Sequence, residues 1–358
     1  MGQTLYRKYR PQLFADVVEQ SHIVTILRQQ LKDGSFSHAY LFSGPRGTGK
    51  TTLARIVAKR LNCLQPAEGE PCNQCESCIA INENRSLDFI EIDAASNRGI
   101  NEIRELKENV KTGTSGSRYK VFVIDEVHML TNEAFNALLK TLEEPPQHAI
   151  FVLATTELHK IPDTIVSRCQ QFRFGRVGLT SVLELLKKVC NLEKVIVEES
   201  VLKLVARRSG GYVRDALSLL SQLVTLASDK ITDDQASLII SQSSWQRVSG
   251  YVLALLKQDG LEAMKIINLS AQEGLDLEVF VVDALELTRL LSVAVITNNW
   301  EELLWLIEES DVNSFKQIIS INNLNLLTYI TDVLIEAHGR SGSLGVPELP
   351  LQAATAKY

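Results

Sequence analysis

Hydrophobic and polar positions follow two different patterns along the chain. In the first half, short apolar runs end in polar residues: Ala39–Phe42, Val121–Ile124 and the run AIFVLA before Thr155. Buried parallel strands have this pattern, and ligands bind at the carboxyl ends of such strands. In the second half, apolar residues recur at helical spacing. The pattern therefore predicts an α/β domain with a mainly parallel sheet at residues 1–178, followed by helical regions.

Two helical regions are expected after residue 178. Four amphipathic segments predict a small all-helical lid at residues 179–242: LTSVLELLKKVCNLE, EESVLKLVARRS, VRDALSLLSQLVTLAS and TDDQASLII. Residues 243–358 are again helical, and EVFVVDALELTRLLSVAVI and WEELLWLIEES have broad apolar faces. These faces are either the core of a self-contained bundle or an oligomerisation surface. Pro350 falls within the last helical pattern, where a proline is able to break the helix.

Composition narrows the class of protein. Hydrophobic residues make up 45% and charged residues 22% of the 358 residues, as expected for a globular protein of more than one domain. Charges interrupt the most apolar segment, so we expect no membrane span. The N-terminus lacks the apolar core of a signal peptide, and we expect a cytoplasmic protein in which disulfides are rare. A net charge of −6 excludes a uniformly basic surface but allows local basic patches.

Four of the cysteines form a compact motif. Cys63, Cys72, Cys75 and Cys78 have the spacing C-x8-C-x2-C-x2-C. Four thiolates at short spacing suit tetrahedral Zn²⁺, and four sulfur ligands leave no coordination position open for a substrate. We therefore expect a structural zinc module at about residues 63–78. Unmetallated thiols and an iron–sulfur cluster remain alternatives, because thiolate spacing alone separates an iron–sulfur cluster poorly from zinc.

The sequence GPRGTGKT follows the first predicted strand and opens a predicted helix. It matches G-x4-G-K-[ST], the P-loop motif that binds nucleotide phosphates. The glycines let backbone N–H groups point at phosphate oxygens, and the helix start adds its positive dipole end. Lys50 would reach the β- and γ-phosphates of ATP, and Thr51 would hold Mg²⁺. The predicted nucleotide-binding residues of this motif are Gly44, Pro45, Arg46, Gly47, Thr48, Gly49, Lys50, Thr51 and Thr52.

Polar residues at the ends of two later strands extend the predicted site. Asp125 can hold the magnesium, directly or through water, and Glu126 is placed to polarise an attacking water. A protein that only binds nucleotide needs only the aspartate, so the adjacent glutamate predicts hydrolysis. The next strand ends in Thr155 and Thr156, where a polar side chain could sense the γ-phosphate.

Two arginines further along are candidates for stabilising phosphoryl-transfer charge. Arg168 follows an apparent short helix, and Arg214 begins an amphipathic helix after the Gly210-Gly211 turn. A planar, permanently charged guanidinium suits this role. A lone arginine is more often a solvated surface charge, so the interpretation depends on the ordered set of motifs around these two.

The ordered set consists of nine motifs: RPQLFADVV, GPRGTGKT, the four-cysteine insert, EIDAASNRGI, VFVIDEVHML, NALLKTLEEPP, LATTE, SRC and GGYVRDALS. The same order of motifs occurs in a known family. The chain resembles the gamma/tau subunits of bacterial DNA polymerase III, which are AAA+ ATPases of the sliding-clamp loader. The motifs cover residues 4–220 densely, and the remainder matches by helical character and by LPLQAA. The resemblance implies an α/β AAA+ P-loop ATPase domain with a zinc-binding insert, a small helical lid, and a C-terminal all-helical collar at residues 243–358.

The resemblance also implies individual roles. Arg168 would act in trans on ATP bound by a neighbouring subunit, Arg214 would be the lid sensor in cis, and Thr156, with Thr155 as the close alternative, would be the strand-end sensor. The adenine end of the pocket would be lined by Tyr6, Arg10, Pro11, Val17 and Val18. Duplex DNA would be contacted by Arg98, Arg104 and Lys140. Glu19 stands where the family usually has glycine, which puts the adenine-pocket geometry in question.

These expectations describe a clamp-loader motor subunit. ATP binding and hydrolysis would drive opening of the sliding clamp and its loading onto primed DNA, in a pentamer with copies of itself and delta- and delta-prime-type subunits. The chain stops at Tyr358 without the extension of tau forms, so contacts with the replicative helicase and polymerase are not implied. Three alternatives stay open: another AAA+ motor such as a branch-migration helicase, a scaffold with a relic nucleotide site, and a thiol redox or metal-sensing protein.

Overall fold

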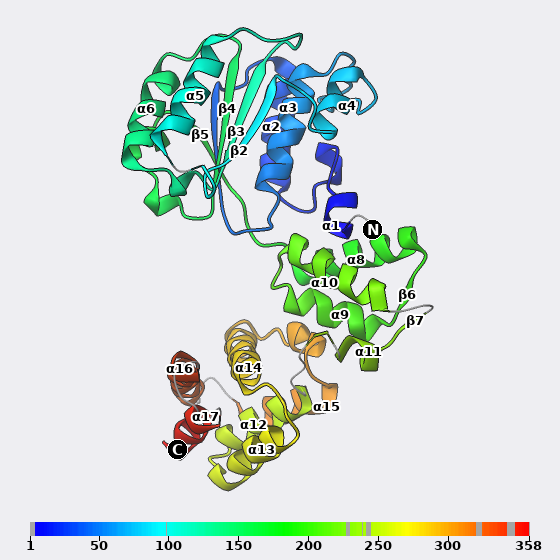
Figure 1. The fold of residues 1–358 in the computed structure, drawn as a ribbon. Helices are drawn as coiled ribbons and strands as arrows, with labels where there is room; N and C mark the ends of the chain where they lie inside the picture. Colours follow the sequence, from blue (N-terminus) through cyan, green and yellow to red (C-terminus); the bar gives the residue numbers. More distant parts are fainter. Residues whose placement is uncertain are drawn as a thin grey trace. The chain divides into compact units, whose positions relative to one another are not determined.

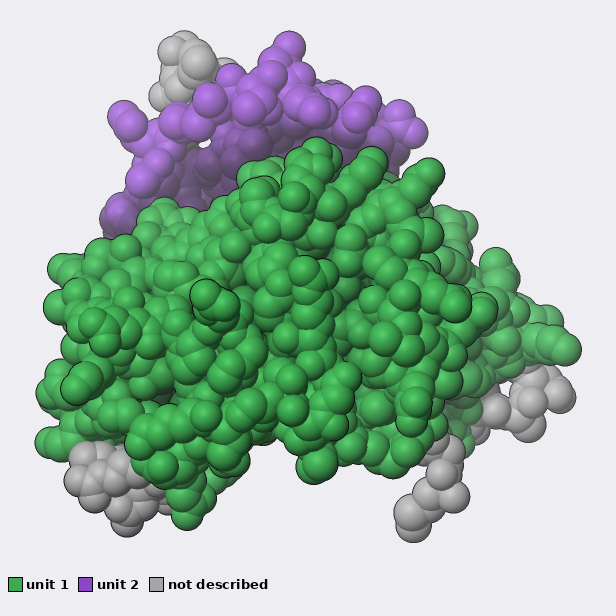
Figure 2. Space-filling view, turned by 90° about the horizontal axis from the view of Figure 1, so that it is seen from above, with its two compact units in different colours: residues 1–232 green, residues 233–358 purple. Residues whose placement is uncertain are grey.

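The computed structural model describes residues 4–97, 99–226, 230–237, 239–240, 245–319, 324–341 and 348–357. The chain divides into two compact units, residues 1–232 and residues 233–358 (Figure 2). No helix in these described ranges is both long and apolar enough to span a bilayer.

A five-stranded sheet in the order β2-β3-β4-β1-β5 forms the centre of the first unit (Figure 1). The strands pair in parallel throughout, which confirms the predicted parallel sheet. Since β3, β4 and β1 are neighbours in register, the polar residues at their carboxyl ends lie at one edge of the sheet. The strands are β1 (Ala39–Ser43), β2 (Phe89–Asp93), β3 (Lys120–Asp125), β4 (Ala149–Thr155) and β5 (Gln170–Arg173).

Helices cover both faces of this sheet (Figure 1). Side chains of β1 alternate between the faces: Tyr40 and Phe42 pack into the layer of α2 and α3, and Leu41 packs into the layer of α5 and α6. Both layers are apolar, which explains why the central strands are continuous hydrophobic runs rather than alternating ones. The four helices are α2 (Ser21–Asp33), α3 (Lys50–Asn62), α5 (Ile100–Lys111) and α6 (Asn132–Glu143).

The lid helices of the first unit match three of the predicted segments: α8 (Leu179–Glu193), α9 (Glu199–Arg208) and α10 (Val213–Leu226). The expectation of an all-helical lid is wrong in one detail, because β6 (Ile196–Val197) and β7 (Lys230–Ile231) pair in parallel. The shorter elements of this unit are α4 (Glu76–Asn82), η2 (Val127–Met129), η3 (Leu158–Lys160) and α7 (Asp163–Val166).

The N-terminal segment lies against both the sheet domain and the lid. It contains α1 (Leu5–Lys8) and η1 (Phe14–Asp16). Glu19 has a φ of 54°, in the left-handed region that favours glycine. Its carboxylate accepts a hydrogen bond from the Gly178 N–H at 3.0 Å, and the Gln20 side chain bonds both backbone groups of Gly175. Glu19 thus ties this segment to the linker that enters the lid.

The second unit is helical, as predicted. A shared core that includes Tyr251, Phe280 and Leu334 joins α12, α14 and α16. The segment WEELLWLIEES is not one helix, because η4 ends at Trp305 and α15 begins at Glu309. The helices are α11 (Asp233–Ser237), α12 (Trp245–Leu256), α13 (Gly260–Gln272), α14 (Leu277–Thr297), η4 (Glu301–Trp305), α15 (Glu309–Ile318), α16 (Leu324–Ser341) and α17 (Leu349–Ala356).

Pro350 does not break a helix. It lies in the first turn of α17, where the missing N–H has no intrahelical partner to lose. The proline therefore helps to define where the last helix begins.

Candidate nucleotide site and cysteine cluster

The loop between β1 and α3 has the backbone that its glycines predict. Gly44, Gly47 and Gly49 have φ values of 144°, 78° and 101°. A Cβ at Gly44 would lie 2.4 Å from the carbonyl oxygen of Phe174, so this position requires glycine for space as well as for conformation. The loop ends at Gly49, which precedes the first residue of α3.

The predicted phosphate and magnesium residues lie together at the end of this loop. The Lys50 ammonium donates hydrogen bonds to the carbonyl oxygens of Gly44 at 2.6 Å and Pro45 at 2.8 Å. Burial lowers the pKa of Lys50, and the carboxylates of Glu126 and Asp125 oppose that shift. The Thr51 hydroxyl donates to Asp125 Oδ2 at 2.8 Å. Hydroxyl and carboxylate oxygens are ligands that Mg²⁺ prefers, so this pair fits the ion predicted from the sequence.

The end of β4 faces Glu126, the acidic residue that follows β3. Thr156 reaches Glu126, to which it donates its hydroxyl at 2.9 Å. Thr155 is fully buried, and its hydroxyl lies 3.0 Å from His128 Nδ1. His128 also lies 3.4 Å from Glu126 and 3.3 Å from Glu157, so the histidine is packed among polar partners next to the candidate base.

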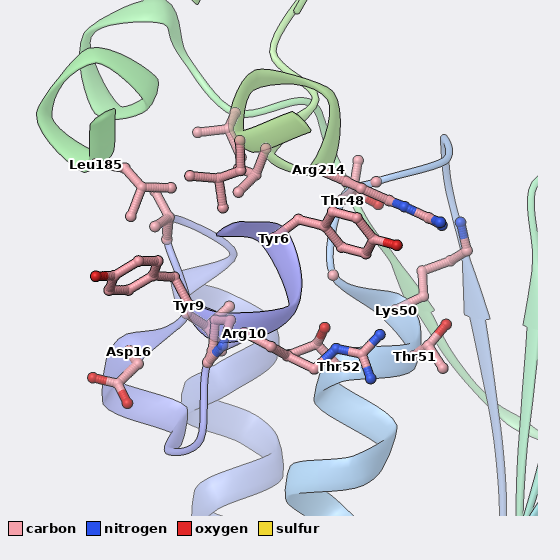
Figure 3. A pocket seen from close by; sticks show the side chains of 18 of the residues that line it. Tyr6, Tyr9, Arg10, Asp16, Thr48, Lys50, Thr51, Thr52, Leu185 and Arg214 are labelled. Carbon is pink, nitrogen blue, oxygen red and sulfur yellow. The ribbon is translucent and has the colours of Figure 1, made fainter. Parts of the chain in front are cut away.

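A cavity of about 690 Å³ opens beside these groups (Figure 3). Lys50 and Thr51 lie on one side of it, and Tyr9 and Leu185 lie on the other (Figure 3). The predicted residues that line it are Tyr6, Arg10, Pro11, Val17, Val18, Arg46, Gly47, Thr48, Gly49, Lys50, Thr51, Thr52, Asp125, Glu126 and Arg214. The structure thus brings the N-terminal segment, the P-loop and the lid to one concave site.

The sequence did not predict all of the residues that line the cavity. The unpredicted lining residues are Lys8, Tyr9, Gln12, Asp16, Asp93, Ala95, Val177, Leu185, Lys188, Val189, Leu192, Val213 and Leu217. On α8, Val189 belongs to the buried apolar stripe that the sequence pattern assigns to core packing, whereas Leu185 is half-buried and Lys188 and Leu192 are exposed. Gln12 and Asp16 lie between predicted residues of the N-terminal segment, and their proximity to Pro11 and Val17 was the available signal.

The two candidate arginines occupy different environments. Arg214 lines the cavity, and its guanidinium carbon is 5.0 Å from the centre of the Tyr6 ring (Figure 3). Arg168 is not among the residues that line the cavity of its own chain. Its guanidinium forms an ion pair with Glu143 and donates to the carbonyl oxygen of Thr164 at 2.7 Å. Its partly exposed position suits the predicted contact with a neighbouring subunit.

The predicted DNA contacts can be located only in part. Lys140 is exposed in the last turn of α6. Arg98 lies outside the described residues. Arg104 belongs to α5, but its side chain lies outside what the structure describes.

The four cysteines gather at the end of α3. Their sulfur atoms all lie within 4.8 Å of one another. Backbone N–H groups donate to two of the sulfurs: Cys72 to Cys63 at 3.2 Å, and Cys75 to Cys72 at 3.3 Å. Such bonds, the one from Gln74 N–H above all, lower the pKa of Cys72 to about 6. Tetrahedral bonds of about 2.3 Å place sulfurs about 3.8 Å apart, so the donor set fits one soft metal ion.

Comparisons with known proteins agree with this architecture, which is that of an AAA+ P-loop ATPase. Residues 19–178 match the family described as "DNA polymerase III, delta subunit", and residues 181–229 match "DNA polymerase III clamp loader subunit, ATPase lid domain". The chain is 48% identical to DNA polymerase III subunit tau of Bacillus subtilis, over 76% of this chain and 49% of that protein. It is 40% identical to DNA polymerase III subunit gamma of Buchnera aphidicola, over 79% and 78%.

The chain therefore belongs to the gamma/tau family of DNA polymerase III clamp-loader subunits. It spans about half the length of the tau relatives, including 52% of DNA polymerase III subunit tau of Escherichia coli, to which it is 39% identical over 90% of its own length. A solved Holliday junction branch migration motor of Thermotoga maritima superposes with a TM-score of 0.48 at 19% identity, over 75% of this chain and 86% of that one. At that score the likeness carries no information about function.

Proposed function

We propose that this chain is the ATPase motor subunit of a DNA polymerase III clamp loader. One observation carries the proposal: Lys50, Thr51, Asp125 and Glu126 meet at one end of a cavity whose other walls are the N-terminal segment and the lid. This arrangement suits a nucleoside triphosphate held by its phosphates at the P-loop and by its base at the far, more apolar end.

In the proposed mechanism, each polar group has one task. Lys50 and the P-loop N–H groups hold the β- and γ-phosphates, and Thr51 and Asp125 would hold Mg²⁺, which neutralises phosphate charge when it is bound. Glu126 orients and polarises the attacking water, and Thr156 holds the Glu126 carboxylate. Arg214 contacts the triphosphate from the lid of the same chain, while Arg168 stabilises charge on ATP bound by a neighbouring subunit.

The remaining parts serve assembly in this proposal. ATP binding between subunits favours a closed spiral that opens the clamp and holds primed DNA, and hydrolysis releases the clamp. The helices of residues 243–358 form the collar that joins copies of this chain to delta- and delta-prime-type subunits. Arg98, Arg104 and Lys140 contact the DNA backbone, and the four cysteines hold a structural Zn²⁺. In this proposal, clamp loading takes place in the cytoplasm.

The test is ATP turnover by the purified chain with its loader partners and clamp, with and without primed DNA. The proposal expects strong stimulation that requires both the clamp and a primer junction, and no nucleotide binding by Lys50→Ala. ATP turnover that does not depend on the clamp would indicate a P-loop ATPase that acts on a target other than a clamp. Branch migration without a clamp would favour the helicase alternative.

A further inference from the structure

A buried lysine connects the cysteine cluster to the wall of the nucleotide cavity. Lys59 ends in an amino group that prefers solvent, yet the residue is only 1% exposed. It donates to the backbone oxygen of Gln12 at 2.9 Å, to Gln12 Oε1 at 2.6 Å and to Asn73 Oδ1 at 2.7 Å. These three acceptors match the three protons of an ammonium. Gln12 lines the cavity, whereas Asn73 lies between two of the cysteines.

A carboxylate makes a second connection between the same two regions. Glu70 accepts hydrogen bonds from the backbone N–H groups of Phe14 at 2.7 Å and Ala15 at 3.1 Å. Both donors belong to η1, which continues from the Gln12 segment toward Val17 in the cavity wall. Charge-assisted bonds of this kind fix backbone position more firmly than neutral ones. The N-terminal segment is therefore held by residues of the cysteine loop at two places, Asn73 at Gln12 and Glu70 at η1.

The cysteine loop needs its own support to present these groups. Asn73 and Glu68 have φ values of 57° and 48°, and the backbone from Cys63 to Cys75 is irregular apart from one bridge between Ala67 and Glu70. A loop without regular structure depends on its side-chain and ligand contacts for a fixed shape. A metal ion held by the four cysteines would supply that fixed shape.

We propose that Lys59, Asn73 and Glu70 are positioning residues for the base side of the nucleotide cavity, so that Zn²⁺ in the cysteine cluster and adenine nucleotide bind cooperatively. The inference rests on the proposed ATP site. Linkage is reciprocal for equilibrium binding, so a metal that orders the wall strengthens nucleotide binding, and nucleotide strengthens metal binding by the same factor.

The geometry predicts that this coupling depends on the base. Asp16, in the N-terminal segment, lies across the cavity from Lys50 and Thr51, which would hold the triphosphate (Figure 3). Gln12 lines the same cavity and belongs to the same segment. A change in the wall should therefore weaken ATP binding and leave inorganic triphosphate binding unchanged. A general loss of structure would weaken both.

The first experiment measures equilibrium binding of ATP and of inorganic triphosphate to the full chain, without reference to hydrolysis. The variants are Glu70→Gln and Lys59→Met, and the matched control is Glu76→Gln, an exposed carboxylate in the same module. We expect ATP affinity to fall at least about fivefold in both variants, with triphosphate affinity and the control unchanged. Lys59→Met places an apolar group among buried polar partners and could prevent folding. Glu70→Gln changes a partly exposed side chain, so that variant tests the proposal even if Lys59→Met does not fold.

Unchanged ATP affinity in Glu70→Gln, or equal losses for ATP and triphosphate, would overturn the inference alone. Failure of the unmodified chain to bind ATP would overturn the proposed function and the inference with it.

The second experiment measures Zn²⁺ affinity by competition with a chromophoric chelator, with and without saturating nucleotide. We expect nucleotide to raise Zn²⁺ affinity at least about fivefold in the unmodified chain and by a smaller factor in Glu70→Gln, which keeps the Lys59 connection. Equal Zn²⁺ affinity with and without nucleotide in the unmodified chain would contradict the coupling.

Discussion

Thr156 donates two hydrogen bonds to a single carboxylate oxygen of Glu126, one from its backbone N–H at 3.2 Å and one from its hydroxyl at 2.9 Å. The preceding residue, Thr155, points to His128 instead. Two adjacent threonines at the end of β4 therefore have different partners, which favours Thr156 over Thr155 as the residue that acts on the candidate base.

Replacing Thr156 by valine keeps the shape of the side chain and removes the hydroxyl. We expect DNA-stimulated ATP turnover to fall at least about tenfold, because a carboxylate that keeps only the backbone hydrogen bond orients the attacking water poorly and general-base catalysis is worth about 10²–10⁴-fold. Nucleotide affinity should stay the same, and Thr156→Ser should retain most of the turnover. Steady-state turnover and equilibrium nucleotide binding check this pair of variants.

Thr155→Val should instead lower stability. The change removes a buried hydroxyl partner of His128, at a cost of about 1–3 kcal/mol. Urea unfolding measures this loss, and turnover per folded molecule should be nearly unchanged. A turnover defect larger than that of Thr156→Val would reverse the assignment of the two threonines.

Arg168→Ala tests the contact between neighbouring subunits. Because Arg168 does not line the cavity of its own chain, ATP affinity of the isolated chain should be unchanged. In the assembled loader, DNA-stimulated turnover should fall at least about tenfold, since arginine fingers contribute up to about 10⁵-fold. Glu143→Gln, which removes the charge of its ion-pair partner, is the control and should retain turnover. Full DNA-stimulated turnover by Arg168→Ala would make the trans assignment wrong.

Gly44→Ala should destabilise the first unit by at least about 2 kcal/mol. The new Cβ would meet the Phe174 carbonyl oxygen at 2.4 Å, and the φ of 144° is strained for any residue with a side chain. The neighbouring backbone cannot easily move, because Phe174 N–H donates to Ser43 and Gly44 N–H to Thr155. Gly113→Ala is the control: its Cβ would meet nothing within 4 Å, so stability should change by less than about 1 kcal/mol. Urea unfolding of both variants decides the point.

The proposed Zn²⁺ site predicts that chelation of metal at the cysteine cluster lowers the unfolding temperature. Structural zinc sites contribute about 10–16 kcal/mol of binding free energy, which is lost with the ion. A strong chelator, or Cys75→Ser, should reduce both zinc content and thermal stability, and added Zn²⁺ should restore the chelated chain where Mg²⁺ does not. Metal analysis and thermal unfolding provide the readouts. Iron in place of zinc would indicate the iron–sulfur alternative, and a chelator without effect on unfolding would contradict a structural metal.

Periodicity and motifs predicted most of the fold because they act locally. The strand before the P-loop and α8 both match the residues predicted for them, since each depends on a clear apolar pattern. The segment after Trp300 shows the limit: its apolar residues suggest one helix, yet η4 ends at Trp305 and α15 begins only at Glu309. Pro350 shows another limit: a proline breaks a helix from inside but is tolerated in the first turn, and Pro350 lies in the first turn of α17.

The site was predictable where each of two contacting residues belongs to a recognisable motif. Thr51 and Asp125 are distant in sequence, but a P-loop and a strand end predict that they lie close together. In the structure the Thr51 hydroxyl is 2.8 Å from Asp125. No comparable rule predicts that Lys59 reaches Gln12 and Asn73, because that contact depends on how two irregular segments pack. A lysine within a helical pattern normally indicates a solvated charge, so the sequence contains no signal that Lys59 is buried.

The hydrogen bonds of Glu19 and Gln20 to the linker at Gly175 and Gly178 have a mechanical consequence. The same N-terminal segment also reaches the lid through the ion pair of Lys8 with Glu193 at 2.8 Å. A rotation of the lid about its linker must therefore displace the residues between these two attachments. Since residues of this segment line the cavity, a change in the angle of the lid should change the width of that end of the cavity.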